Sequence, residues 1–134
     1  MSILVDTSVW SLMLRRKSAG DHPASLFLQA CIRDQASLFL TGLVFQEILQ
    51  GIRSRSQFKK IRGYLLDFPF LEATPTVHEK AAEIFNQSKK SGFNASTLDC
   101  LIAAVAIHHR CRLLTADSDF NELSKYSSLE TIDY

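Results

Sequence analysis

The 134-residue sequence is poor in cysteine, almost without net charge and free of long apolar runs, and each absence excludes a class of protein. Its three cysteines, Cys31, Cys100 and Cys111, form an odd set without a CxxC pair, and no histidine stands at zinc-site spacing from them. We therefore expect no zinc site, and buried thiols in a reducing compartment. The apolar opening before Asp6 is too short for a signal peptide or a membrane span. These features predict a cytoplasmic protein.

The charge balance does not indicate a partner, because 15 lysine and arginine residues stand against 14 aspartate and glutamate residues. Any electrostatic argument must therefore come from the arrangement of the charges along the chain. The sequence contains no internal repeat, no low-complexity segment and no linker, and its length suits one domain. We accordingly expect a single domain that spans residues 1–134.

Short apolar runs alternate with stretches of helical periodicity. The runs at 3–5, 37–40 and 112–115 each lead into polar residues, which is typical of buried parallel strands. A proline limits residues 68–71 to an edge strand or a connection, and residues 128–132 suit a last short edge strand. Helical patterns are expected around 9–14, 23–33, 43–49, 55–65, 74–90, 98–107 and 120–123. The alternation predicts an α/β fold, a three-layer α/β/α sandwich with a mostly parallel central sheet.

Acidic residues stand where such strands end. Asp6 follows the first apolar run directly, and Asp117 and Asp119 follow the last strong run. In open α/β sheets, ligands bind just outside the carboxyl ends of the strands. The simpler alternative for Asp6 is a helix cap, and Ser8 would also suit the cap of the helix that follows. Asp117 and Asp119 would likewise suit the cap of a short helix.

Two further acids stand in apolar helices that begin near the same sheet edge. Glu47 is the only acid between Asp34 and Asp67, and Asp99 is the only charge in the apolar helix expected at 98–107. A carboxylate on such a face is rarely left without a partner or a bound cation. Two alternatives stay open: Glu47 faces solvent or pairs with a following arginine, and Asp99 is favoured by the helix dipole.

The expected topology would bring four of these acids into one cleft, because parallel strands end at one edge of the sheet. Crowded carboxylates repel one another, so either some are protonated or a cation neutralises them. Oxygen ligands without histidine or cysteine suit Mg²⁺ or Mn²⁺. Such ions activate water and brace phosphoryl oxygens. Phosphodiester hydrolysis is therefore the reaction class that the acids indicate.

A basic segment free of acids follows the helix of Glu47. Its cations are Arg53, Arg55, Lys59, Lys60 and Arg62. A local basic patch on a nearly neutral protein attracts phosphates. A solvated helix face is the commoner explanation of a charge run, so contact with a nucleic acid stays a hypothesis at this point.

Four segments together resemble a PIN-domain ribonuclease, and more closely the VapC-type toxins of bacterial and archaeal toxin–antitoxin pairs. They are residues 3–8, the helix with Glu47, residues 99–104 and residues 114–120. No single segment is specific, but together they span essentially the whole chain in the family's order and spacing. The resemblance implies an Mg²⁺- or Mn²⁺-dependent endoribonuclease that cuts tRNA, rRNA or mRNA and inhibits translation. It also implies a homodimer and a small antitoxin whose tail occupies the site.

The resemblance assigns roles to residues by position. The catalytic acids that it implies are Asp6, Glu47, Asp99 and Asp117. Among them Asp6, Asp99 and Asp117 would hold the metal, and Glu47 would complete the shell or orient the water. The supporting residues are Thr7, Ser8, Thr115 and Asp119, of which Asp119 is an outer ligand or a helix cap. The basic segment matches no family position, so RNA contact and antitoxin contact both stay open for it.

One position departs mildly from the family pattern, and two other functions compete with the toxin. Cys100 stands where a small apolar residue is common, which puts little in doubt. The chain would also suit a PIN nuclease that processes RNA or DNA without an antitoxin, or a catalytically silent PIN-like binding module. For the homodimer, we expect an exposed Trp10 and phenylalanine side chains to supply the surface.

Overall fold

The centre of the protein is a four-stranded, all-parallel sheet in a computed structural model that describes residues 1–15 and 22–134. The strands are β1 (Ser2–Val5), β2 (Ser37–Thr41), β3 (Phe70–Leu71) and β4 (Arg112–Leu114), in the order β3-β2-β1-β4. In β1, Leu4 lies opposite Phe39 of β2 and Leu113 of β4. The strands expected at the three apolar runs are confirmed, and β3 is the edge strand that the proline-containing segment allowed.

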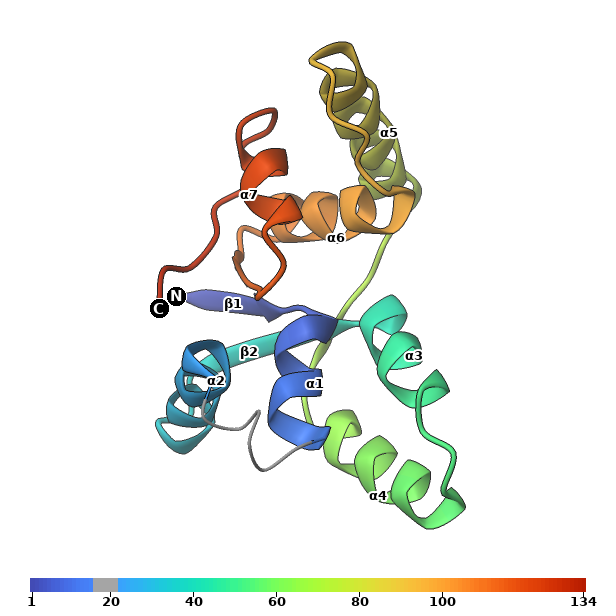
Figure 1. Ribbon diagram of the computed structural model, residues 1–134, viewed down its shortest axis with the longest axis vertical. Helices are drawn as coiled ribbons and strands as arrows, with labels where there is room; N and C mark the ends of the chain where they lie inside the picture. The colour runs from blue at the N-terminus through green and yellow to red at the C-terminus, as the bar shows by residue number, and fades with distance from the viewer. Residues whose placement is uncertain (16–21) are drawn as a thin grey trace.

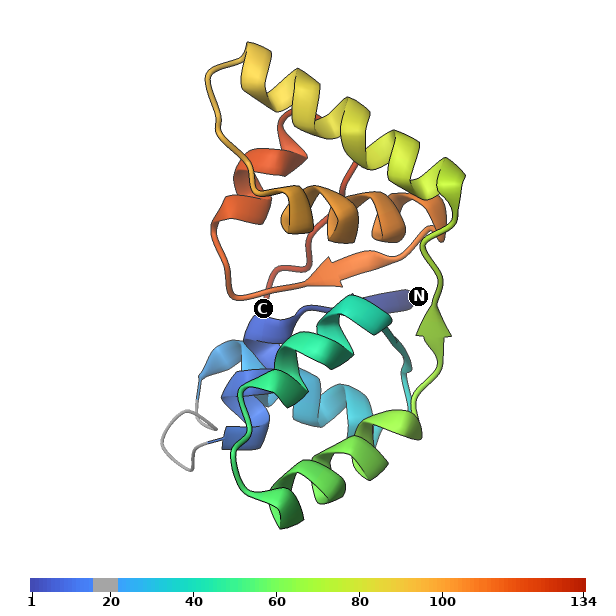
Figure 2. The same cartoon turned by 90° about the vertical axis from the view of Figure 1, so that its right-hand side faces the viewer.

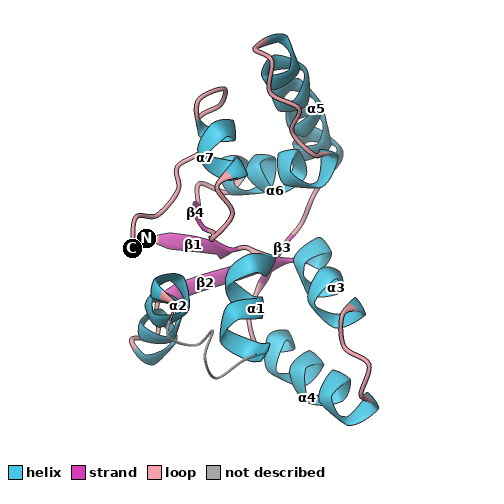
Figure 3. Ribbon diagram, in the orientation of Figure 1, coloured by secondary structure: helices cyan, strands magenta, loops and turns pink. Residues whose placement is uncertain are grey.

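Helices cover both faces of this sheet, as expected for a three-layer sandwich. They are α1 (Thr7–Arg15), α2 (Pro23–Arg33), α3 (Gly42–Gln50), α4 (Arg55–Leu66), α5 (Pro75–Lys90), α6 (Thr97–His108) and α7 (Asp119–Ser124). Figure 1 shows the first four on one side of the sheet and the last three on the other. Figure 3 shows the same layers by type of structure. Among the described helices, none has the length and apolar character that a membrane crossing requires.

The core explains why β1 is apolar without alternation. Ile3, Leu4 and Val5 are all essentially inaccessible to solvent, because β1 has a strand on either side and helices on both faces. Helix α6 packs against the same sheet and is apolar almost all round, with residues 102–106 buried. These two elements therefore hold their ends, and the acids attached to those ends, in fixed positions.

Two expectations about local structure are wrong. Residues 128–132 do not form a strand, since only a single parallel bridge between Thr131 and Leu113 is present. Ser8 does not cap α1, because the helix already begins at Thr7 and the carbonyl of Asp6 accepts the first helical N–H groups. The Ser8 hydroxyl is instead used in long-range bonds at the sheet edge, described below.

Trp10 is buried, so the expectation of an exposed indole is wrong. It has no exposed surface, and its ring packs edge-on against Tyr64 (6.4 Å between centroids) and Phe68 (5.1 Å). These aromatic contacts join α1 to the C-terminal end of α4 and the residues just after it. The indole Nε1 has no hydrogen-bond partner among the described residues. Trp10 therefore contributes to the core and is excluded from any dimer surface.

Candidate metal centre

Asp6 is fixed at the carboxyl end of β1 by two hydroxyl groups. Its backbone N–H donates to the carbonyl of Leu114 (3.0 Å), which carries the pairing of β1 with β4 one residue further. The hydroxyls of Ser8 (2.8 Å) and Thr115 (3.0 Å) both donate to Oδ2 of Asp6. Only 6% of Asp6 is exposed, so these donors replace the water that the carboxylate loses on burial.

The same two hydroxyls join the ends of β1 and β4. Ser8 Oγ accepts the N–H of Ala116 (3.0 Å), and Thr115 Oγ1 accepts the N–H of Asp117 (3.0 Å). The sequence places Ser8 and Thr115 107 residues apart, yet they share Asp6 as an acceptor. This network sets the position of the loop that carries Asp117.

Glu47 is directed toward the same edge by its neighbour in space, Thr7. The hydroxyl of Thr7 donates to Oε1 of Glu47 at 2.9 Å, across 40 residues of sequence. Glu47 lies on α3, whose first turn is capped by Thr41 Oγ1 accepting the N–H of Val44 (3.1 Å). No ion pair of Glu47 with an arginine occurs in the described part of the chain. Glu47 therefore does not form the ion pair with a following arginine that the sequence left open.

Asp99 lies in the first turn of α6 and is half-buried. Its N–H donates to Oγ of Ser96, the N-cap of the helix (3.0 Å). Burial, and then the negative charges of Asp117, Asp6 and Asp119, raise the pKa of Asp99 from 3.8 to about 6, while a hydrogen bond with Ser96 acts in the opposite direction. Three of the four acids expected to meet, Asp6, Asp99 and Asp117, thus lie near enough for their charges to affect one another, whereas Glu47 is not among the charges that act on Asp99.

The loop after β4 supplies two acids to this cluster. Oδ1 of Asp117 accepts the N–H of Asp119 (2.9 Å), which is the first residue of α7. One carboxylate oxygen from each of Asp99, Asp117 and Asp119 lies within 4.8 Å of the other two. Three carboxylates from two separate segments can therefore share one ion. We name the set of Asp6, Asp99, Asp117 and Asp119 the acidic cluster.

The tightest group within the acidic cluster differs from the expected metal set. Sequence reasoning placed Asp6 with Asp99 and Asp117, whereas the structure places Asp119 there. Asp6 stands beside this group, but its Oδ2 is taken up by two hydroxyl donors. The signal for Asp119 was present as an Asp-x-Asp pattern after a strand, and it was given only the role of an outer ligand or cap.

No basic side chain neutralises the acidic cluster within the residues that the structure describes. The salt bridges found there are Arg33–Asp34, Arg112–Glu130 and Lys125–Glu122, and all lie elsewhere. The chemistry of the donor set is oxygen only, which suits a hard divalent cation and excludes a soft one. The residues present therefore fit the Mg²⁺ or Mn²⁺ that the sequence indicated, although they do not distinguish between the two ions.

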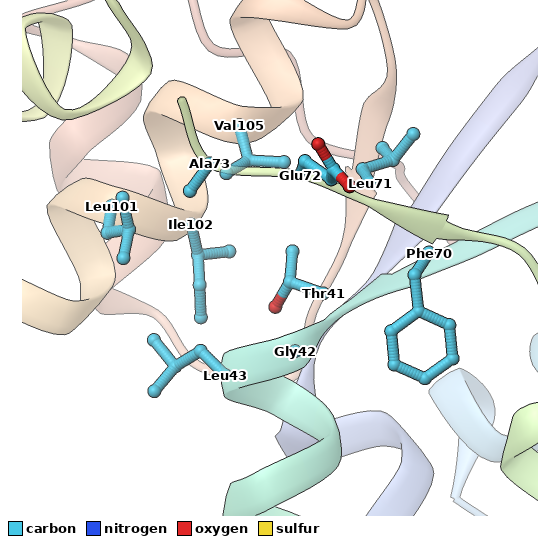
Figure 4. Close-up of a pocket in the computed structure, with 10 residues that line it drawn as sticks. All are labelled: Thr41, Gly42, Leu43, Phe70, Leu71, Glu72, Ala73, Leu101, Ile102 and Val105. Atoms are coloured by element: carbon cyan, nitrogen blue, oxygen red, sulfur yellow. The ribbon is translucent and has the colours of Figure 1, made fainter. Parts of the chain in front are cut away.

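The other predicted residues occupy separate surfaces. The basic segment lies on α4 and just before it, outside the acidic cluster. A cavity of about 490 Å³ between α3, β3 and α6 contains none of the acids of the cluster and is mostly apolar (Figure 4). A smaller cavity of about 270 Å³ does reach Asp117 and is lined in part by Tyr134, whose hydroxyl donates to the carbonyl of Thr115 (3.0 Å). Sequence reasoning did not anticipate this contribution of Tyr134.

Comparison with known proteins agrees with this geometry. The family model described as PIN domain matches residues 3–126. The chain belongs to the PIN domain family. This PIN domain is 25% identical to VapC ribonuclease Mb1587 of Mycobacterium bovis and to Ribonuclease VapC11 of Mycobacterium tuberculosis, over 98% of both chains in each case.

Solved structures share the fold of this PIN domain. The crystal structure of VapBC2 from Rickettsia felis bound to a promoter DNA fragment contains a chain that matches with a TM-score of 0.76 and 16% identity, over 100% of this chain and 99% of that one. FitAcB from Neisseria gonorrhoeae matches with a TM-score of 0.73 and 20% identity, over 98% and 96%. The α/β/α sandwich expected from the sequence is therefore confirmed as that of a PIN domain.

Proposed function

We propose that this PIN domain is an Mg²⁺- or Mn²⁺-dependent endoribonuclease that acts as the toxin of a type II toxin–antitoxin pair and inhibits translation by cutting RNA. The observation that carries the proposal is the convergence of the acidic cluster, without a neutralising cation, at the carboxyl edge of the sheet. The full-length similarity to VapC ribonucleases supports RNA as the substrate class.

Each acid has a distinct part in this proposal. Asp99, Asp117 and Asp119 hold the ion, since their oxygens already stand close together. The ion, when bound, polarises a phosphoryl oxygen and lowers the pKa of a water molecule. Asp6, kept in one orientation by Ser8 and Thr115, adds a fourth carboxylate next to the ion site.

Glu47 has a different task from the acids that hold the ion. The Thr7 hydroxyl donates to Oε1 of Glu47 at 2.9 Å, which fixes the carboxylate against the first residue of α1. We assign to Glu47 the hydrogen bond that orients the attacking water, or completion of the ion's shell. Both assignments require a Glu47 carboxylate that is held in one position, which the Thr7 contact provides.

Two partners belong to this proposal. A small antitoxin is expected because VapBC2, FitAcB and a toxin–antitoxin complex from Klebsiella pneumoniae, which matches with a TM-score of 0.67 and 21% identity, share the fold. A second copy of the chain is expected on the α6 apolar surface, which we define as Leu43, Phe85, Leu98 and Leu101. These residues line two apolar cavities of about 490 and 470 Å³ that share Leu101.

The decisive experiment is cleavage of end-labelled tRNA and mRNA by purified protein, with Mg²⁺, with Mn²⁺ and with EDTA, followed by mapping of the cut ends. We expect internal cuts only with the metal. The Asp6→Asn variant should lose at least about 100-fold in rate, because it removes one fixed charge from the site. Asp67→Asn is the matched control, since Asp67 is an exposed residue at the far end of α4 and should leave the rate unchanged.

Three outcomes would contradict the proposal in whole or in part. Equal cleavage by wild type and Asp6→Asn would remove the acids from the mechanism. No cleavage of any RNA with either metal would favour a silent binding module. Cleavage in a chain whose gene has no small partner gene immediately upstream would favour a PIN nuclease of RNA processing without an antitoxin.

A further inference from the structure

Five cations stand close together in the chain without any acid among them. Four lie on α4, and the fifth, Arg53, stands two residues before this helix. The sequence has no Asp or Glu between Glu47 and Asp67, while residues 53–62 contain five Arg and Lys residues. The rest of the chain therefore holds ten basic residues against fourteen acidic ones. This nearly neutral protein is strongly polarised, with its excess positive charge on one helix.

These cations are exposed and unpaired in the described part of the chain. All five residues are exposed to solvent. In the described part of the chain, none of their charged nitrogens lies within 4 Å of a carboxylate oxygen. The guanidinium of Arg55 lies over the ring of Phe58 at 5.6 Å, a contact that orients the group but leaves its charge uncompensated. The positive charge of this helix is therefore free to bind a ligand, because no intramolecular ion pair in the described part of the chain neutralises it.

The cations do not spread evenly round the helix. Arg55, Lys59 and Arg62 stand at spacings of four and three residues, which places them within about 60° of one another and over about 10 Å of helix length. We name these three residues the basic stripe. Lys60 points about 140° away from Arg55. Ile61 and Leu65, on another side, are buried and fix the rotation of the helix.

The helix of the basic stripe is attached to the elements that hold the site. Helix α4 packs against α3, which carries Glu47. Tyr64 of α4 packs against Trp10 of α1, the helix that begins with Thr7. Figures 1 and 2 both show α3 between α6, where Asp99 stands, and α4. A chain bound at the acids can therefore continue over α3 to the basic stripe.

We propose that the basic stripe binds the phosphate backbone of the RNA substrate on the far side of α3 from Asp99 and supplies most of the salt-dependent affinity. This inference rests on the proposed ribonuclease function. Phosphates need such a positive site because the acids themselves repel a polyanion. The contacts carry no sequence information, so they position the RNA and do not select the cut.

The test uses full-length protein that carries Asp6→Asn, so that RNA is bound but not cut. Binding of a fluorescein-labelled single-stranded RNA is measured by anisotropy over a range of salt concentrations in Mg²⁺. Lys59→Glu and Lys60→Glu are the matched pair, since adjacent exposed residues undergo the same change of charge on different sides of the helix. We expect Lys59→Glu to weaken binding at least tenfold more than Lys60→Glu does.

The triple reversal of Arg55, Lys59 and Arg62 to Glu should lower the slope of log K against log salt by about 2, at about 0.7 per lost phosphate contact. Thermal unfolding of each variant checks that the fold is intact. Equal effects of the Lys59 and Lys60 variants on RNA binding would overturn the proposal. An unchanged salt dependence in the triple variant would also overturn it and would indicate that α4 binds a protein partner. Loss of RNA binding by the triple variant, together with no cleavage by the wild type, would uphold the basic stripe and refute the nuclease.

Discussion

At the scale of single residues, the site is built from pairs of a hydroxyl and a carboxylate. Thr7 fixes Glu47, and Ser8 and Thr115 together fix Asp6. Each hydroxyl compensates a partly buried negative charge that would otherwise be costly. Asp99 receives less compensation, since burial and three nearby acids outweigh its bond with Ser96. Asp99 is therefore the carboxylate whose charge opposes folding of the metal-free protein.

Asp99→Asn should stabilise the metal-free protein at pH 7 and leave it nearly unchanged at pH 4. In the folded state the pKa of Asp99 is about 6, above its ordinary value of 3.8, so the folded state binds the proton more tightly. The free energy of unfolding of the wild type then falls as pH rises from about 4 to about 6. The amide carries no charge and loses nothing over this range. Urea unfolding in EDTA at both pH values measures the difference.

Asp67→Asn provides the comparison for this pH dependence, because Asp67 is exposed at the C-terminal end of α4 and is not a member of the acidic cluster. With Mn²⁺ the sign should reverse for Asp99→Asn, which loses the stabilisation that a bound ion gives to the folded state. An Asp99→Asn protein that is less stable than wild type at pH 7 in EDTA would show that the charge of Asp99 does not destabilise the metal-free fold.

At the scale of elements, α6 combines a structural and a functional task. Its interior residues are buried, so its axis is fixed by the core, and its N-cap Ser96 sets the first turn that carries Asp99. The carboxylate is thus directed by a helix end and not by a loop. Glu47 is also carried by a helix, since it lies in the second turn of α3, which begins at the cap made by Thr41.

Ser96→Ala should cost about 1 kcal/mol of stability, the usual loss for an N-cap, and should also weaken Mn²⁺ binding by about tenfold. The reason is that the first turn of α6 loses its cap and Asp99 loses its fixed position. Urea unfolding and titration calorimetry with Mn²⁺ measure the two effects. Ser54→Ala is the control, because Ser54 caps α4 in the same manner with the N–H of Gln57 (3.3 Å) but is distant from the acids in sequence. Equal Mn²⁺ affinity in both variants would show that the cap serves stability alone.

At the scale of the whole molecule, charge and apolar surface are separated. The acids gather at the sheet edge, the basic stripe lies on α4, and the α6 apolar surface lies between α3, α5 and α6. Leu98 is 46% exposed on this surface, directly before Asp99 in the chain. Burial of such a surface against a second copy would remove apolar area from water beside the site.

Leu98→Glu should convert a dimer into a monomer. The introduced carboxylate would be buried without a partner in the interface, which costs far more than the same charge in solvent. Light scattering coupled to size exclusion should give about twice 15.1 kDa for the wild type and 15.1 kDa for the variant. Leu26→Glu is the control, since Leu26 is 51% exposed on α2, outside the α6 apolar surface, and should leave the dimer intact. A wild type of 15.1 kDa would remove the dimer from the proposed function.

The sequence by itself determined the elements and the edge at which the acids lie. Apolar runs followed at once by acids define parallel strands and their carboxyl ends, and Asp6 and Asp117 are attached there by short-range chemistry. The order of the motifs was sufficient to indicate a PIN domain, which the family match confirms. Helix caps such as that of Ser96 also depend on residues adjacent in the chain.

Only the tertiary structure decided which side chains face one another. It gathered Asp119 with Asp99 and Asp117, set Asp6 beside them with two hydroxyl donors, and buried Trp10 against Tyr64. Periodicity states which side of a helix is apolar but not which element covers it, so the indole's burial was missed. Contacts across about a hundred residues depend on how the strands are paired, and this pairing has no local signature in the chain.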